Sequence, residues 1–360
     1  MQLGLSRTSW LGWWRTALLA RRALRRWRRT GVGDGDDTGR TAFYTALWRD
    51  AAAGLGEGAR FRELDDAFWE IRYRGRCTRI ARGMVMLDNP VTLALAGHKA
   101  LVHRLLAATD LPVPPSHEFT LATLDEGEAF VREYGSPCVV KPARNSGAGE
   151  GVATHITRAE LVRAALNASL YSRYVLIERQ IPGDCYRLLY LHGRLLHAIR
   201  RHAPSVTGDG RSTIRQLITA ENARRAQDRG ASVTRLRIDL DMKTTLRHAR
   251  LTLRSVPDAG EAVVVKTVVN DNARADNVAV TCEIGAALRD EGARAAATLG
   301  VSLAAIDVIT PNPRVSLGEA NGVIIEVNST PGLHHHYNVR NPDGVDVAGP
   351  LLRCLLGLHD

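Results

Sequence analysis

Residues Ile324 to Tyr337 read IIEVNSTPGLHHHY, and this stretch decides how the rest of the chain is interpreted. An apolar run typical of a buried strand ends in Glu326 and Asn328, and three consecutive histidines follow a Pro-Gly turn. Side chains two residues apart in a strand lie on one face, so the acid and the amide would present their oxygen atoms together. Neighbouring residues of a strand point to opposite faces, so the histidines at 334–336 would not converge on one ion. We therefore expect metal ligands before the turn and a substrate-facing loop at the histidines.

A second strand supplies a third candidate ligand. The mostly apolar run VSLAAIDVIT, residues 301–310, contains Asp307. A carboxylate in a buried strand needs a positively charged partner. Asp307, Glu326 and Asn328 together form a set of hard oxygen donors, which suits Mg²⁺ held partly by protein and partly by nucleotide phosphates.

A glycine-rich segment lies further upstream, in SPCVVKPARNSGAGEGV at residues 136–152. Lys141 ends a short apolar run, from which a lysine can reach phosphate oxygens. Glycines in the following loop would let backbone N–H groups close over the same phosphates. The segment is not a Walker P-loop, because G-x-x-x-x-G-K-[ST] is absent from the sequence. Taken alone, a glycine-rich loop after a strand is weak evidence, and a surface hairpin is the commoner explanation of such a segment.

The stretch from Tyr174 to Thr213 reads as three strands separated by turns at Pro182-Gly183 and near His192-Gly193. Glu178 closes the first strand and could bind a purine base or ribose. Arg200 and Arg201 follow the third strand, so one of them must point inward, where an arginine is costly without an anionic partner. The alternative is a solvated basic pair at the end of a strand.

Composition limits the class of protein. The chain has 360 residues and a net charge of +10, of which eight arginines in residues 1–30 account for all but +2. The basic character therefore belongs to an N-terminal arm and does not indicate nucleic-acid binding by the whole chain. No apolar run approaches the roughly 20 residues of a membrane span. Five scattered cysteines without a C-x-x-C pair argue against a disulfide framework and favour a cytoplasmic location.

Helical and strand patterns alternate along the chain and predict an α+β protein built from α/β lobes. The arm holds four tryptophans beside its arginines, so it could lie on an anionic membrane surface, contact RNA, or be a disordered extension. The expected divisions are a disordered arm and linker at 1–40, an N-terminal lobe at 41–97, a central subdomain at 98–174 and a C-terminal subdomain at 175–356.

The motifs occur together in an order that resembles the ATP-grasp superfamily of carboxylate–amine ligases. The likeness is greatest to the ATP-grasp portion of cyanophycin synthetase and to related glutathione-synthetase-like ligases, over about residues 90 to 335. The resemblance implies an ATP-grasp fold with a small N-terminal lobe. The strings that carry it are LPVP, VVKP…GAGEGV, ERQIPGDCYRLL, VTGDGRSTIRQLI, LGVSLAAIDVIT and IIEVNSTPGL.

The resemblance also implies roles for individual residues. Two lysines would contact phosphate, a glycine-rich loop would cover it, a hinge would hold adenine, and arginines would act near the γ-phosphate. The lysines are Lys99 and Lys141, and the loop contains Ser146, Gly147, Gly149 and Gly151. The hinge contains Ile177, Glu178 and Ile181. The arginines are Arg200 and Arg201, and Asn270 and Arg274 would reach substrate or phosphate. The metal ligands are those named above. Cys185 stands where the family often has an acid, with Asp184 shifted by one, which leaves the ribose contact open.

The implied reaction joins a carboxylate to an amine through an acyl phosphate, with release of ADP and phosphate. It needs ATP and Mg²⁺, as two ions, with Mn²⁺ as a substitute, and it takes small amino acids or peptides as substrates. A homo-oligomer is compatible with this reading. The chain ends soon after the histidines without the Mur-ligase-like half of cyanophycin synthetase, so we do not expect it to make that polymer unaided. Two alternatives stay open: an ATP-grasp kinase, and a non-catalytic nucleotide-binding module tethered by the arm.

Overall fold

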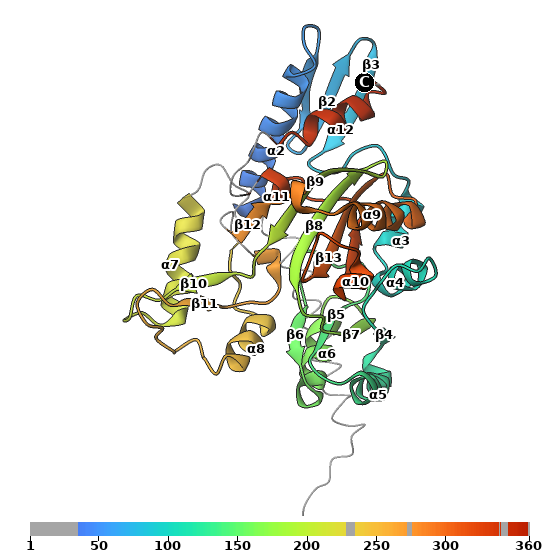
Figure 1. Cartoon of the computed structure of the whole chain (residues 1–360). Helices are drawn as coiled ribbons and strands as arrows, with labels where there is room; N and C mark the ends of the chain where they lie inside the picture. The colour runs from blue at the N-terminus through green and yellow to red at the C-terminus, as the bar shows by residue number, and fades with distance from the viewer. Residues whose placement is uncertain (1–34, 228–234, 272–275, 338, 340–344, 359–360) are drawn as a thin grey trace, which may run out of the picture.

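The computed structural model describes residues 35–227, 235–271, 276–337, 339 and 345–358. Figure 1 shows an N-terminal lobe at the top, a five-stranded sheet in the middle and a four-stranded sheet below it, with a smaller unit beside them. Helices and strands are mixed throughout, as the sequence predicted. Within the described residues, no helix is both long and apolar enough to cross a membrane.

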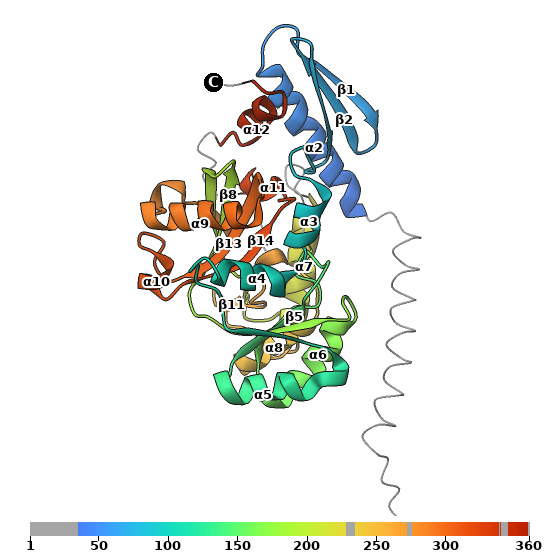
Figure 2. The ribbon, with the colours of Figure 1, turned by 90° about the vertical axis from the view of Figure 1, so that its right-hand side faces the viewer.

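The N-terminal lobe is a helix packed on a three-stranded antiparallel sheet, and the last helix of the chain joins it. Trp48 and Trp69 are fully buried here and pack with Leu351 and Leu352 from that last helix. Figure 2 shows α2 and α12 side by side, although they lie far apart in the sequence. The helix α2 begins inside the segment expected to be a linker. The elements are α2 (Gly35–Ala53), β1 (Arg60–Asp65), β2 (Phe68–Tyr73), β3 (Arg76–Ala81) and α12 (Ala348–Leu355).

The central subdomain contains an antiparallel sheet in the order β4-β7-β5-β6, with α5 and α6 packed against it. The expected division after residue 174 falls just before β7, which pairs with β4 and β5 and so lies in this sheet. The preceding helices are α3 (Pro90–Ala96) and α4 (Lys99–Ala107). The sheet and its helices are β4 (Ser116–Phe119), α5 (Leu124–Tyr134), β5 (Cys138–Pro142), β6 (Ala153–Ile156), α6 (Leu161–Ser169) and β7 (Val175–Arg179).

The five-stranded antiparallel sheet has the order β12-β9-β8-β13-β14. One face carries Tyr186, Leu188 and Ile306 and is covered by α4 and α9. The opposite face, called here the site face, carries the charged residues described below. The elements are β8 (Asp184–Leu191), β9 (Arg194–Arg201), β12 (Asn277–Ala279), α9 (Ala286–Leu299), β13 (Leu303–Thr310), α10 (Leu317–Ala320), β14 (Val323–Asn328) and α11 (His334–Tyr337).

The smaller unit is inserted between β9 and β12 and has its own apolar core, which includes Ile214, Met242 and Val265. Its two short strands pair antiparallel, and α8 packs against β6 of the central subdomain. The unit therefore contacts the glycine-rich hairpin from outside the two large sheets (Figure 1). Its elements are β10 (Ser205–Thr207), α7 (Ile214–Gln227), α8 (Leu240–His248) and β11 (Ala262–Val264).

Candidate functional site

The three predicted metal ligands lie together on the site face. Asp307 on β13 and Glu326 on β14 are direct cross-strand partners, which places their side chains on the same face. Asn328 lies two cross-strand pairs further along, opposite Ala305, and its Nδ2 donates to Asp307 Oδ2 at 3.3 Å. This geometry follows from the two-residue spacing in β14 and the register of β13 against it.

Arg187 on β8 completes this row, and the sequence analysis missed it. Its Nε and Nη2 atoms donate to the two carboxylate oxygens of Asp307 at 2.7 Å each, and both side chains are buried. Burial alone would raise the pKa of Asp307, but attraction to Arg187 and the hydrogen bonds from it outweigh burial and lower the pKa. The argument applied to Arg200 and Arg201, that an arginine within an apolar strand needs an anion, would also have found Arg187.

Of the two consecutive arginines, Arg201 lies on the site face and Arg200 does not. Arg201 is 3% exposed and its Nη2 donates to Val269 O at 3.1 Å and Asn270 Oδ1 at 3.2 Å. Burial, followed by repulsion from Arg187, lowers the pKa of Arg201 to about 10. Arg200 pairs with Asp184 at 2.8 Å, and both side chains are partly exposed. One arginine of the pair therefore points inward, as the alternation along β9 requires.

Two lysines of the central subdomain lie next to β14, where Lys99 approaches Glu326 and Lys141 Nζ lies 3.5 Å from Ile325 O. Lys99, at the start of α4, has its Nζ 3.4 Å from Glu326 Oε1 and donates to Ser146 O at 3.1 Å. Lys141, near the end of β5, has its Nζ 2.7 Å from Glu178 Oε1. Both lysines are nearly buried and have a carboxylate close by. The structure thus brings together residues that lie far apart in the sequence.

His103 is a second buried polar residue that sequence reasoning missed. It lies one helical turn after Lys99 in α4, so both face the site. Its Nδ1 is 3.2 Å from Ser116 Oγ and 3.7 Å from Glu178 Oε1. Burial lowers the pKa of His103, which favours a neutral ring. The four-residue spacing from Lys99 was the signal available in the sequence.

The glycine-rich segment forms the loop of the β5–β6 hairpin. Gly149 and Gly151 have positive φ values of 68° and 75°. A Cβ on Gly149 would come within 2.8 Å of both Asn270 Nδ2 and Val268 Cγ1, whereas one on Gly147 would meet nothing within 4 Å. Ser146 Oγ lies 3.3 Å from Lys99 Nζ. The loop therefore contacts both α4 and the segment that binds Arg201.

The predicted adenine hinge spans the end of β7. Ile177 and Glu178 are buried, and Ile181 is half-buried in the turn that follows. Glu178 is held by Lys141 and His103 on the inner side of the sheet. Cys185 lies on the site face as the cross-strand partner of Arg201, and burial raises the pKa of its thiol to about 11. These placements leave the predicted nucleotide contacts of the hinge as proposals.

The three histidines form a helical turn, α11, and the expected strand geometry is wrong at this position. The turn begins after Pro331-Gly332, where His335 N bonds to Gly332 O at 3.2 Å. His334 packs edge-on against Phe43 and Tyr44 of α2. His336 Nδ1 lies 2.9 Å from Nδ1 of His197 on β9. The described residues contain no cluster of three or more His, Cys, Asp or Glu residues that could hold a metal.

Asp307, Glu326 and Asn328 nevertheless fit a hard cation by their chemistry, since two carboxylates and an amide offer only oxygen ligands of the kind Mg²⁺ prefers. This set is not a cluster of acids, histidines and cysteines alone, because an asparagine is one of its three members. Arg274 and the arm at 1–30 lie outside the described residues, so their expected roles stay predictions.

Comparisons with known proteins show what the chain is similar to. Residues 98–184 match the family model described as carbamoyl-phosphate synthase L chain, ATP binding domain. The chain is 29% identical to cyanophycin synthetase of Trichormus variabilis over 324 residues, which cover 86% of this chain and 36% of that protein. It is 27% identical to the glutathione biosynthesis bifunctional protein GshAB of Listeria welshimeri over 297 residues, covering 81% and 38%. The chain thus spans little more than a third of these relatives.

Among solved structures, the bifunctional glutathione synthetase from Pasteurella multocida matches with a TM-score of 0.54 at 18% identity, covering 87% of this chain and 43% of that one. The chain therefore has an ATP-grasp fold, as its motifs predicted. Within that class it is similar to part of cyanophycin synthetase and to part of the bifunctional glutathione-forming proteins.

Proposed function

We propose that this protein is an ATP-dependent carboxylate–amine ligase that forms an amide through an acyl phosphate and releases ADP and phosphate. The observation that carries the proposal is the approach of Lys99 to Glu326 and of Lys141 to the neighbouring carbonyl of Ile325, beside the row Arg187, Asp307 and Glu326 on the site face. The site thus offers cations for phosphate oxygens and oxygen ligands for a metal. Its similarity to cyanophycin synthetase and GshAB supports the same chemistry.

Asp307, Glu326 and Asn328 would hold Mg²⁺, as two ions, and Mn²⁺ could replace it. When bound, the metal neutralises charge on the nucleotide phosphates. Lys99 and Lys141 would exchange their present carboxylate partners for phosphate oxygens. The hinge at Ile177, Glu178 and Ile181 would bind adenine, and the loop from Ser146 to Gly151 would cover the phosphates.

In phosphoryl transfer, a protein acts mainly by positioning the reactants and by neutralising charge in the transition state. Arg201, buried on the site face and cross-strand from Cys185, would neutralise charge that develops on the transferred phosphoryl group. Arg187 holds Asp307 ionised and oriented for the metal. The closed glycine-rich loop would keep water from the acyl phosphate, which would otherwise hydrolyse. Asn270 and Arg274 complete the proposed set of substrate or phosphate contacts, and Arg200 falls outside it.

The substrates of this reaction would be amino acids or short peptides, as the names of the relatives suggest. The histidines of α11 lie between the site face and α2, so they would form the wall of the substrate pocket nearest the N-terminal lobe. Five free cysteines favour a cytoplasmic location. The arm at 1–30 would tether the protein to an anionic membrane or to RNA, and deletion of these residues with a binding assay for each would test this.

The decisive experiment is a screen of amino-acid and dipeptide pairs for ADP release by the purified full chain. Ligase activity requires that release depend on both a carboxylate and an amine, and that an amide appear in equal amount. A stable phosphorylated alcohol formed without an amine would instead identify a kinase. ATP binding without turnover on any pair would identify a non-catalytic module. The matched variant is Glu326→Gln, which keeps the size of the side chain and removes a proposed metal ligand.

A further inference from the structure

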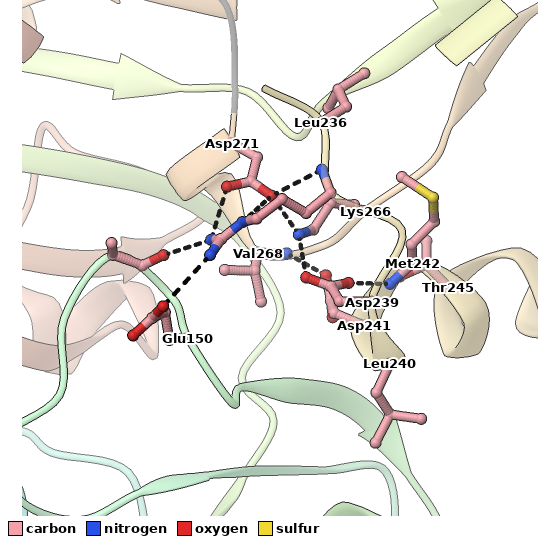
Figure 3. Close-up of polar contacts among 12 residues, drawn as sticks. Glu150, Leu236, Asp239, Leu240, Asp241, Met242, Thr245, Lys266, Val268 and Asp271 are labelled. Atoms are coloured by element: carbon pink, nitrogen blue, oxygen red, sulfur yellow. Dashed lines mark hydrogen bonds and ion pairs between the residues drawn. The ribbon is translucent and has the colours of Figure 1, made fainter. Parts of the chain in front are cut away.

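A buried ion cluster joins the inserted unit to the glycine-rich loop. Lys266 is 1% exposed, and its Nζ lies 2.6 Å from Oδ2 of Asp239 and 2.6 Å from Oδ2 of Asp271. Figure 3 shows these two aspartates on either side of Lys266, with Glu150 approaching from the loop. Asp239 also caps α8 by accepting from Met242 N at 3.0 Å. The cluster therefore fixes the position of Asp271 relative to the inserted unit.

Arg237 extends this cluster onto the glycine-rich loop itself. Its Nη2 donates to Asp271 Oδ1 at 2.9 Å and to Ala148 O, in the middle of the loop, also at 2.9 Å. Its Nη1 lies 3.9 Å from Glu150 Oε1. The arginine is thus oriented by a buried acid on one side and binds a loop carbonyl on the other.

Residues 267–270, which lead into Asp271, pack against the glycine-rich loop. Asp241 accepts from the backbone N–H of Thr267 at 3.1 Å and of Val268 at 3.0 Å, and from Thr154 Oγ1 on β6 at 2.7 Å. This holds the segment against the hairpin that carries the loop. Val268 and Asn270 then lie so close to Gly149 that a Cβ there would collide with both.

The same segment binds Arg201 on its other side, through Val269 O and Asn270 Oδ1. Residues 268–271 therefore lie between the loop expected to cover the phosphates and the arginine expected to neutralise the transferred group. A loop that left this position would lose its contacts with Arg237 and with the segment together. Loop closure and the placement of Arg201 are in this way structurally linked.

We propose that Arg237, oriented by Asp271, is a positioning residue that holds the glycine-rich loop closed over the nucleotide phosphates. The effect on catalysis rests on the proposed function. The contact between Arg237 and the loop is present in the folded chain without it. Without Arg237 the loop opens more often, so ATP binds less tightly and water reaches the acyl phosphate. The acyl phosphate then hydrolyses to carboxylate and inorganic phosphate, and ADP accumulates without an equal amount of amide.

The test compares Arg237→Met with Arg247→Met in the full chain. Arg247 on α8 pairs with Glu160 of the central subdomain and, like Arg237, joins the inserted unit to that subdomain, but none of its described contacts is to the loop. Hydrogen–deuterium exchange of the peptide covering residues 145–152 is measured first, without nucleotide. Arg237→Met should raise this exchange about threefold or more, since loop opening governs it. Arg247→Met should leave it unchanged.

Kinetics then separate a positioning role from a merely structural one. In Arg237→Met the KM for ATP and the ratio of ADP to amide should both rise, whereas a loss of global stability alone would lower active protein without changing that ratio. Unchanged loop exchange in Arg237→Met, or an equal change in Arg247→Met, would overturn the proposal. If wild-type protein makes no amide, the proposed function fails, but the exchange result still decides the role of Arg237. Arg237→Lys, which keeps the charge, replaces Arg237→Met if the latter does not fold.

Discussion

Arg187 and Asp307 face each other on the neighbouring strands β8 and β13 and share two hydrogen bonds of 2.7 Å. Both side chains are almost completely buried, so neither charge is well solvated by water. The pair therefore holds Asp307 ionised beside Glu326 and Asn328, where the proposed function places a metal ligand. A buried ion pair of this kind contributes through orientation, because much of its attraction offsets the loss of hydration.

Removal of Arg187 alone should be strongly destabilising. Arg187→Met leaves Asp307 buried without its partner, and we expect the free energy of unfolding to fall by about 3–5 kcal/mol. Arg187→Met combined with Asp307→Leu should recover part of this loss, but no ligase activity. Urea unfolding of the single and double variants measures both effects.

The exposed pair Arg200 and Asp184 provides the control for this prediction, since it joins the neighbouring strands β9 and β8 at the surface. Arg200→Met should lower the free energy of unfolding by no more than about 1 kcal/mol. If Arg187→Met lowers the free energy of unfolding no more than Arg200→Met does, the buried pair does not hold Asp307 in the way described.

The sequence predicted the strands and the ligand row because both depend on local spacing. Glu326 and Asn328 lie two residues apart, and the apolar runs around Asp307 and Glu326 are typical of buried strands. The partner of Asp307 was missed because Arg187 and Asp307 meet only through strand pairing, which the sequence does not display. The packing of α12 on α2 was missed for the same reason. The expectation for the histidines used strand geometry, but β14 ends at Asn328 and a helical turn follows Pro331-Gly332.

Lys141 should contribute to ATP binding, and its removal should also lower stability because buried Glu178 loses its partner at 2.7 Å. Lys141→Met removes a cation proposed to bind phosphate, and a charged hydrogen bond of this kind is worth about 1.5–3 kcal/mol. The KM for ATP should therefore rise about tenfold to a hundredfold. Lys243→Met on α8 is the matched control, because Lys243 is exposed on the inserted unit. Equal KM values for the two variants would remove Lys141 from the phosphate site.

A Cβ added at Gly149 would collide with neighbouring side chains, whereas one added at Gly147 would contact nothing. Substitutions at these two nearby positions therefore test the geometry of the loop. Gly149→Ala places a Cβ against Asn270 and Val268 at a positive φ, which costs about 1–2 kcal/mol before any collision. ATP affinity, measured by titration calorimetry, should fall in Gly149→Ala. It should stay near the wild-type value in Gly147→Ala, because nothing lies within 4 Å of a Cβ there. A larger loss in Gly147→Ala would contradict the described loop position.

The buried histidines should make the protein sensitive to mild acid. Burial lowers the pKa of His197 to about 4 and of His334 to about 3, and lowers that of His336 as well. An unfolded histidine takes up its proton near pH 6.5, so between that pH and the folded value the unfolded state binds more protons. The free energy of unfolding is therefore unaffected by these histidines above pH 6.5. It falls as the pH decreases toward 4, by up to about 1.4 kcal/mol per pH unit for each histidine.

Urea unfolding from pH 7 to pH 4 measures this slope, and single variants assign it. His334→Phe should reduce the slope, because a phenyl ring can occupy the site against Phe43 and Tyr44 and takes up no proton. His117→Gln is the control, since His117 is exposed and pairs with Glu126 at the surface. His197 and His336 share a hydrogen bond, so they should titrate as a pair, and replacing either should alter the contribution of both. A slope that is the same in His334→Phe and His117→Gln would show that the buried ring of His334 does not set the acid sensitivity.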